Sequence, residues 1–398
     1  MTWHFFRKAD WLDRSRATVY LALFAAINVA SLVLLVATSQ GGIDRNGSLL
    51  GTDFLSFWAA GQMLHSGAPV YDAAAHIAAQ RAFYAPENGY MAFLYPPSFL
   101  PFCWPLGLVS YFPALVGWLL ATGSLYVFAV RKWLDEMAVD RPTWLLCAAF
   151  PPVLLTITHG QSAFLVAGLL GLGALLVPRA PILAGALFGL ATIKPQFGLL
   201  LPLALLMTRE WRVILAAGVT ALAVAIASAA LFGWTIWADW YLASDRAQSA
   251  LVAGEVAYAK MMSPLAALKL LGAPNGVAFA VQGIVAISVA GAVVWAAWGR
   301  RWNSALAALV LAGAPLVTPF VLDYDMVLLA FPLIYLAATG FRDWERLALV
   351  FGFAGAALAR PLALHAGIPV MPLITGFLFV VLARRVLGAA SVPSLATE

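Results

Sequence analysis

The sequence predicts an all-α polytopic membrane protein with about 12 transmembrane helices and short surface helices in its first outer loop. Of the 398 residues, 63% are hydrophobic and only 10% are charged, whereas a soluble domain is about 45–50% apolar and roughly 25% charged. The same figures exclude a disordered chain, which needs low hydrophobicity and high charge. The apolar runs are unbroken instead of alternating, so we expect helices and not the strands of a barrel.

Charge and cysteine content exclude several classes of partner. The net charge of +5 is small for this length and no Lys/Arg-rich run occurs, so we expect no nucleic-acid partner. The two cysteines, Cys103 and Cys147, lie in apolar stretches, and no Cys/His pattern has metal-ligand spacing. We therefore predict no metal site, no cofactor and no disulfide framework.

Long apolar runs separated by turns that carry Lys or Arg give the predicted crossings. The first, 17–38, is too long for the apolar region of a signal peptide, so we expect an uncleaved anchor. Runs 181–193 and 196–207 are short for a span of about 20 residues and are expected to form a broken or tilted pair around Lys194-Pro195. The other crossings are expected as one net crossing within 97–130 and at 143–158, 162–177, 213–232, 276–298, 304–322, 326–339, 346–362 and 368–383.

Basic residues predict the orientation of these crossings. Sixteen of the 23 Lys and Arg residues fall on the predicted cytoplasmic side and five in opposite-side loops, as the positive-inside rule requires. Both termini are then cytoplasmic. Large outer loops are expected at 39–96 and at 233–264, the second of which carries Trp and Tyr residues that suit a membrane–water interface. We expect one transmembrane domain over 1–390 and a loose tail at 391–398.

Asp53 is the first candidate for chemistry among the 18 Asp and Glu residues. It begins a predicted helix whose apolar face carries Phe54, Phe57 and Trp58, and such a helix would lie flat on the outer membrane surface. A carboxylate at the bilayer boundary is placed to act as a general base. The alternative is an N-cap with a structural role only.

Three more ionisable residues interrupt apolar runs. Asp323 and Asp325 flank Tyr324, and because residues two apart point in different directions on a helix, at most one need face a site. The alternative for this pair is a polar turn between spans. Lys194 precedes a proline and could hold a phosphate as a point charge, or its ammonium could snorkel to the interface.

The remaining candidates lie at the outer ends of predicted spans. Arg360 and His365 end the penultimate crossing, where a guanidinium can grip phosphate or anchor at the interface. His159 and Gln161 flank a glycine between two crossings without a second residue at metal-ligand spacing, and a hydrogen-bonded turn is the alternative. Tyr95, before two prolines, is expected to end a surface helix and direct the next one.

All of these polar residues collect near the non-cytoplasmic face under a single topology. A cleft that opens to the membrane and carries acid, base and cation suits a lipid-borne anionic substrate. The coincidence therefore predicts a binding or catalytic site on the outer side.

At these residues the sequence resembles the glycosyltransferases of family 87. These membrane enzymes of the C-type superfamily are typified by the polyprenyl-phosphate-mannose-dependent mannosyltransferase of phosphatidylinositol mannosides. Family members often carry His or Trp near the second polar turn, where this chain has Asp323-Tyr324-Asp325. The motifs of the resemblance, which spans roughly residues 20–340, are Asp53-Phe…Phe57-Trp-Ala-Ala-Gly61, Gly67-Ala-Pro-Val-Tyr-Asp72, Tyr95-Pro-Pro97, Gly160-Gln161, Lys194-Pro195 and Thr318-Pro319.

The resemblance implies a catalytic membrane domain that transfers one sugar from a polyprenyl monophosphate. Mannose is the favoured sugar, the acceptor is a hydroxyl of a lipid-linked or envelope glycan, and the anomeric centre inverts. The family's catalytic aspartate lies in the first outer loop and matches Asp53, which we expect to be the general base.

The other candidate residues are assigned to substrate binding. We assign Lys194 and Arg360 to the donor phosphate and Asp323 or Asp325 to the sugar hydroxyls. Trp58 and Tyr95 are expected to stack on a sugar. The predicted set is completed by His159, Gln161 and His365.

Two rival functions remain open. A transporter or flippase of lipid-linked sugars would show internal repeats and discontinuous helices near the midplane, and Lys194-Pro195 favours it. A non-catalytic scaffold would tolerate changes at Asp53. For the enzyme, we expect a bacterial inner (plasma) membrane location, membrane lipids as partners and a site on the periplasmic side.

Overall fold

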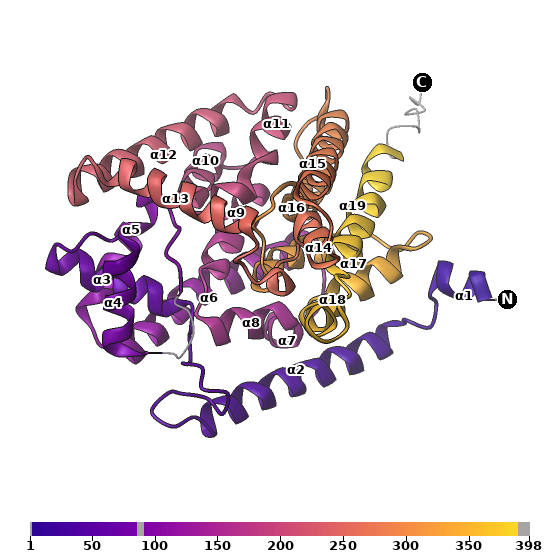
Figure 1. Cartoon of the computed structure of the whole chain (residues 1–398). Helices are drawn as coiled ribbons and strands as arrows, with labels where there is room; N and C mark the ends of the chain where they lie inside the picture. The colour runs from indigo at the N-terminus through magenta and orange to yellow at the C-terminus, as the bar shows by residue number, and fades with distance from the viewer. Residues whose placement is uncertain (1, 86–90, 389–398) are drawn as a thin grey trace.

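The computed structural model describes residues 2–85 and 91–388, in which no β-strand occurs. Figure 1 shows the helices gathered into one body, with α2 crossing its edge and α3 and α4 together at another. The predicted tail at 391–398 lies outside the described residues. The α-helices of the first half are α1 (Thr2–Lys8), α2 (Arg14–Ala37), α3 (Phe54–Ser66), α4 (Ala73–Phe83), α5 (Leu100–Cys103), α6 (Tyr111–Glu136), α7 (Thr143–Ala149), α8 (Pro151–His159) and α9 (Ala163–Leu176).

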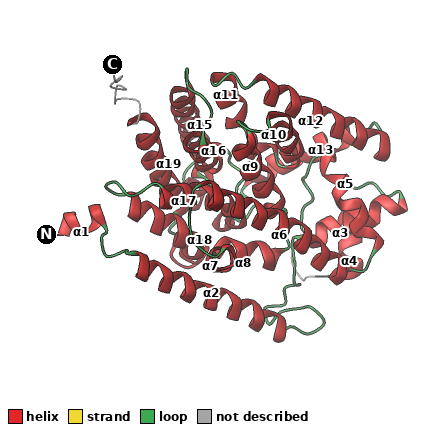
Figure 2. Ribbon diagram, turned by 180° about the vertical axis from the view of Figure 1, so that it is seen from behind, coloured by secondary structure: helices red, strands yellow, loops and turns green. Residues whose placement is uncertain are grey.

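The second half continues with longer helices and several 3₁₀ turns, and Figure 2 shows the same bundle from behind. Its α-helices are α10 (Pro181–Leu190), α11 (Leu200–Met207), α12 (Trp211–Phe232), α13 (Ile236–Ala253), α14 (Pro264–Leu270), α15 (Asn275–Ala297), α16 (Ser304–Val317), α17 (Ala330–Ala338), α18 (Glu345–Ala366) and α19 (Met371–Gly388). The 3₁₀ turns are η1 (Pro97–Phe99), η2 (Trp104–Leu108), η3 (Ala191–Ile193), η4 (Pro195–Gly198), η5 (Tyr258–Lys260) and η6 (Asp323–Leu329).

Six described helices are long and apolar enough to cross a membrane, namely α2, α6, α12, α15, α18 and α19. The polytopic helical class is therefore confirmed, whereas the number of 12 crossings is not. Four shorter apolar segments match predicted crossings but are below this length, at Ala163–Leu176, Pro181–Ile193, Pro195–Met207 and Ser304–Val317. The predicted crossing at 143–158 is split into α7 and α8 because Pro151 lacks the N–H that would continue the helix.

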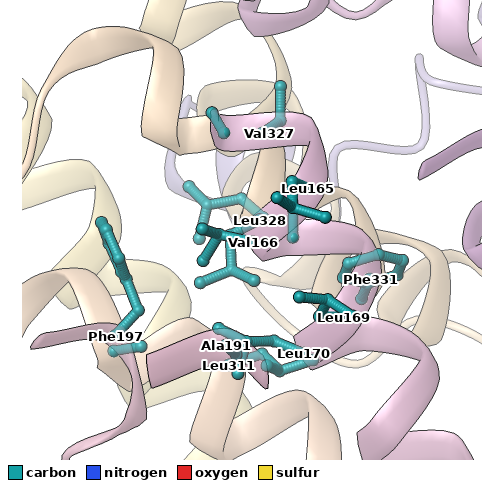
Figure 3. Close-up of a cluster of buried hydrophobic side chains, with 14 of the residues drawn as sticks. Leu165, Val166, Leu169, Leu170, Ala191, Phe197, Leu311, Val327, Leu328 and Phe331 are labelled. Atoms are coloured by element: carbon teal, nitrogen blue, oxygen red, sulfur yellow. The ribbon is translucent and has the colours of Figure 1, made fainter. Parts of the chain in front are cut away.

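The core is centred on α9, which is buried on nearly all sides and is correspondingly apolar all round. In Figure 3, Leu165 and Leu169 of this helix lie near Phe331 of α17. Gly171 permits the contact, since a Cβ there would come 2.2 Å from the Phe331 ring. Apolar packing thus fixes the segment that follows η6 against α9.

The first outer loop is a packed unit and not a helix resting on lipid. The apolar face of α3 is buried within the protein, against η2 and α4. The backbones approach closely at Gly61, because a Cβ there would lie 2.4 Å from the Cys103 carbonyl oxygen and 2.7 Å from Gly107 N. The expectation that α3 lies flat with its apolar side in the membrane is therefore wrong, since protein covers that side.

The structure adds a helix to one loop prediction and contradicts another. The region 233–264 contains the 18-residue helix α13, which carries three of its aromatic residues, Trp237, Trp240 and Tyr241. Tyr95 does not end a surface helix: α4 already ends at Phe83, and Pro97 begins the short turn η1.

The polar contacts around the Asp53 loop and the ion pairs of basic residues lie at opposite ends of the long helices. The Tyr111 hydroxyl at the start of α6 donates to the Gly51 carbonyl at 2.7 Å, while Glu136 at the other end pairs with Arg179 at 2.8 Å. Likewise, α18 starts beside Asp343, which pairs with Lys8 at 2.9 Å. The length of the helices therefore separates the Asp53 end of the bundle from the end that holds Arg179 and Lys8, which we call the arginine-rich end.

Candidate functional site

Asp53 stands at the start of α3 on a backbone tied to the turn after α8. Its N–H donates to the His159 carbonyl at 3.1 Å, and Gly51 N–H donates to the Thr158 carbonyl at 3.0 Å. The residue occupies the N-cap position, but its side chain makes no capping hydrogen bond. Instead, Asp53 Oδ2 accepts from Gln161 Nε2 at 2.9 Å. The carboxylate therefore does not cap α3, as the alternative role of a structural N-cap would require.

Gln161 is buried, and its neighbours fix which way its amide points. Its Oε1 accepts from Ser162 N–H at 3.0 Å and from the Tyr95 hydroxyl at 2.9 Å. Because a backbone N–H can only donate, the amide oxygen must face Ser162 and the NH₂ group must face Asp53. Tyr95 OH also lies 2.6 Å from Ser162 Oγ. Tyr95 and Ser162 thus fix the amide that holds one oxygen of Asp53 in place.

Lys194 lies in the break between α10 and α11, where it forms a buried ion pair. Its Nζ is 2.8 Å from Asp325 Oδ1, and the side chains are only 8% and 4% exposed. The ammonium also lies 5.5 Å from the ring centroid of Tyr95 and 5.2 Å from that of Tyr324, which is cation–π range. Pro195 starts η4 and prevents the helix from continuing through this point. The predicted broken pair around Lys194-Pro195 is confirmed.

A second cation–carboxylate group stands beside the first. Arg360 Nη1 is 3.4 Å from Asp323 Oδ2 and 3.3 Å from His159 Nε2. His159 Nδ1 is 2.9 Å from the Leu155 carbonyl oxygen, which can only accept, so this nitrogen carries the proton and Nε2 faces the guanidinium as an acceptor. Both aspartates of the Asp-Tyr-Asp turn therefore enter the site, each with its own cation, where the sequence argument required only one.

Most predicted site residues come together, and two do not. Trp58 donates its indole N–H to the Val109 carbonyl at 2.9 Å and packs on Phe83 with ring centroids 5.0 Å apart. His365 is exposed near the end of α18, and no hydrogen bond or ion pair to a described residue joins it to the network. Tyr95 stacks on Phe99 at 4.3 Å. Sequence reasoning missed Ser162, whose only signal was a hydroxyl next to Gln161.

The arrangement combines one partly exposed carboxylate with two cations. Asp53 and Arg360 are partly exposed, whereas Lys194, Asp323 and Asp325 are buried. No group of three or more His, Cys, Asp or Glu side chains that could hold a metal ion is found in residues 2–85 and 91–388. Chemically, the site offers a proton acceptor next to groups that can bind an anion.

The comparisons with known proteins give one result. Residues 93–319, more than half of the chain, match the model of glycosyltransferase family 87. No curated protein and no solved structure matches the chain.

Proposed function

Since this chain belongs to glycosyltransferase family 87 and is thus a membrane glycosyltransferase, we propose the following reaction. It transfers a single sugar, with mannose favoured, from a polyprenyl monophosphate to a hydroxyl of a lipid-linked or envelope glycan acceptor. Asp53 is the general base and the anomeric centre inverts.

The observation that carries the proposal is the asymmetric surrounding of the Asp53 carboxylate. Oδ2 is held by Gln161 at 2.9 Å, while Oδ1 receives no hydrogen bond from a described residue. A base needs this combination, because one oxygen must fix the geometry and the other must reach the proton that it removes. The partly exposed position of Asp53 leaves room for an acceptor hydroxyl.

The reaction is balanced with one carboxylate. Asp53 takes the proton of the acceptor hydroxyl, the acceptor oxygen forms a bond to the anomeric carbon, and the bond from that carbon to the phosphate oxygen breaks with its electron pair. Glycosidases need a second carboxyl group to protonate a poor alkoxide leaving group. A polyprenyl phosphate leaves as a stabilised anion, so cations can take the place of the acid.

Arg360 is the better placed of the two cations for the donor phosphate. Its side chain is 24% exposed, and its Nε and Nη2 atoms have no described partner, so a bidentate contact with phosphate is open to it. Lys194 is buried and paired with Asp325. This supports an indirect role, in which the ammonium contributes positive potential near the phosphate without contacting it. Asp323 and Asp325 then hold the cations, more than they orient sugar hydroxyls.

The Asp53→Asn variant tests the proposal. The purified variant, incubated with radiolabelled polyprenyl-phosphate sugars and a native lipid extract, should show a turnover about 10²- to 10⁴-fold lower than that of the wild type. Asp72→Asn is a matched control in the same outer loop, because Asp72 caps α4 by accepting from Ala75 N–H at 2.8 Å and asparagine is an equally good cap. Near-normal turnover of Asp53→Asn would remove the residue from this role.

The site is proposed to face the periplasm of a bacterial inner membrane, with both termini in the cytoplasm. Support comes from the separation of the arginine-rich end from the Asp53 end along the same helices. The test replaces Cys103 and Cys147, both buried, and adds a single cysteine at exposed Glu255 or at exposed Arg301. A membrane-impermeant thiol reagent added to intact cells should label only the first position, and labelling only the second would reverse the orientation.

A further inference from the structure

A cavity of about 520 Å³ lies at the end of the molecule opposite to Asp53. It is bounded by the end of α15, the start of α16, the end of α17 and the end of α19, whereas the Asp53 network meets the other ends of α16 and α17. The 14 residues of α16 alone separate the two sites by about 21 Å. Four arginines converge on the cavity together with a tyrosine, namely Arg300, Arg301, Arg342, Arg385 and Tyr335.

Two of these arginines are fixed by the ends of neighbouring helices. Arg385 donates to the carbonyl oxygens of Thr339 at 3.0 Å and Gly340 at 2.6 Å, where α17 ends. Arg300 donates to the Val386 carbonyl at 2.9 Å on α19. These contacts occupy helix-end carbonyls and form a rigid wall. Arg301 and Arg342 stand at the rim with exposed side chains.

The positive charge of the cavity is poorly compensated. No acidic residue lines it, although the Glu345 carboxylate lies 3.4 Å from Arg385. Arg300, Arg301 and Arg342 form no ion pair with any described residue. The positive-inside rule accounts for basic residues at this end of the helices, but it does not require them to gather around one cavity. A cavity lined by several arginines is suited to bind an anion.

The surroundings indicate that this anion belongs to a lipid. Trp295 and Trp298, on the turn of α15 that leads to the cavity, are 68% and 69% exposed, and tryptophans of this kind mark the headgroup level of a bilayer. The volume lies within the range of roughly 300–1,000 Å³ typical of small-ligand sites. Basic pockets between helices at this level suit phosphate headgroups.

We propose that this cavity binds the phosphate of an anionic phospholipid headgroup, in the leaflet opposite to the catalytic site. Arg301 and Arg342 make the exchangeable contacts at the rim, while Arg300 and Arg385 shape the wall. The binding is separate from the sugar transfer, so it stands or falls independently of the role of Asp53.

The test compares the full-length protein with the Arg301→Gln/Arg342→Gln variant in neutral detergent. Native mass spectrometry measures retention of phosphatidylglycerol and of zwitterionic phosphatidylcholine. The wild type should prefer phosphatidylglycerol, and the variant should bind it about 30-fold more weakly, at about 1 kcal/mol for each arginine. The control Arg209→Gln/Arg384→Gln removes the same charge from exposed arginines outside the cavity and should bind like the wild type.

A second arm distinguishes a lipid from a free anion. If the acyl chains contribute to binding, inorganic phosphate should leave the unfolding temperatures of both proteins almost unchanged. A rise in the wild type that is absent from Arg301→Gln/Arg342→Gln, without any lipid preference, would assign the cavity to a soluble phosphate and overturn the lipid proposal. Equal retention of phosphatidylglycerol by both proteins, or an equal loss in the control, would overturn the site itself.

Discussion

Replacing Gln161 by leucine isolates the amide that holds the carboxylate of Asp53, the proposed base. The substitution removes the 2.9 Å hydrogen bond to Asp53 Oδ2 and leaves Asp53 in place. A hydrogen bond to a charged group contributes about 1.5–3 kcal/mol. If that contribution is made in the transition state, kcat falls about 10- to 150-fold, while KM for the donor should change little because the Gln161 amide is buried and already bonded to Asp53, Ser162 and Tyr95.

The assay is sugar transfer by the purified variant, with kcat and KM measured separately. Gln282→Leu is the matched control because both glutamines are 5% exposed. Gln282 also bridges two backbone groups, accepting from Leu265 N–H at 3.1 Å and donating to the Leu316 carbonyl at 2.9 Å. This control should lower the unfolding temperature as much as Gln161→Leu does and leave kcat unchanged.

A double-mutant cycle gives the result that would refute the reasoning. If Gln161 acts through Asp53, then adding Gln161→Leu to Asp53→Asn should cost almost no further activity. Losses that multiply in the double variant would show that Gln161 acts on the reaction by another route.

Three other predictions concern stability. Lys194→Met leaves the Asp325 carboxylate buried without its cation and should cost about 3–5 kcal/mol of unfolding free energy; Lys194→Met/Asp325→Leu should recover the unfolding temperature without activity. Gly61→Ala should destabilise the fold strongly, because the new Cβ meets backbone atoms, whereas Gly117→Ala, with open space around it, should be neutral or stabilise a helix by up to about 1 kcal/mol. Burial lowers the pKa of His76, so the folded protein favours the neutral imidazole. The contribution of His76 to the free energy of unfolding is therefore present above the unfolded pKa of about 6.5 and is lost as pH falls below it. The unfolding temperature should drop on acidification, and less so in His76→Gln.

The sequence was most informative where apolar runs are long and uninterrupted. The predicted crossing at 17–38 corresponds to Arg14–Ala37, and that at 276–298 to Asn275–Ala297, because continuous hydrophobicity over about 20 residues has few structural solutions. Short runs were harder to interpret. The segment 143–158 reads as one span, yet Pro151 divides it into two helices.

The candidate site was predictable in its members but not in its pairing. Ionisable residues at apolar positions identified Asp53, Lys194 and Arg360 from their chemistry alone. Nothing local could show that Lys194 pairs with Asp325, 131 residues away, or that Arg360 pairs with Asp323, because these partners are chosen by tertiary packing. For the same reason Trp58 was expected near a sugar, although its indole is engaged by the Val109 carbonyl.

The distance along the chain between Lys194 and Asp325 has a consequence for biosynthesis. At roughly 5–20 residues per second, the 131 residues between them take roughly 7–26 s to be translated. During that interval the ammonium enters the bilayer without its carboxylate, although Tyr95, already synthesised, can offer its ring. A nascent chain therefore cannot form this buried ion pair until Asp325 and the helices that surround it have been synthesised.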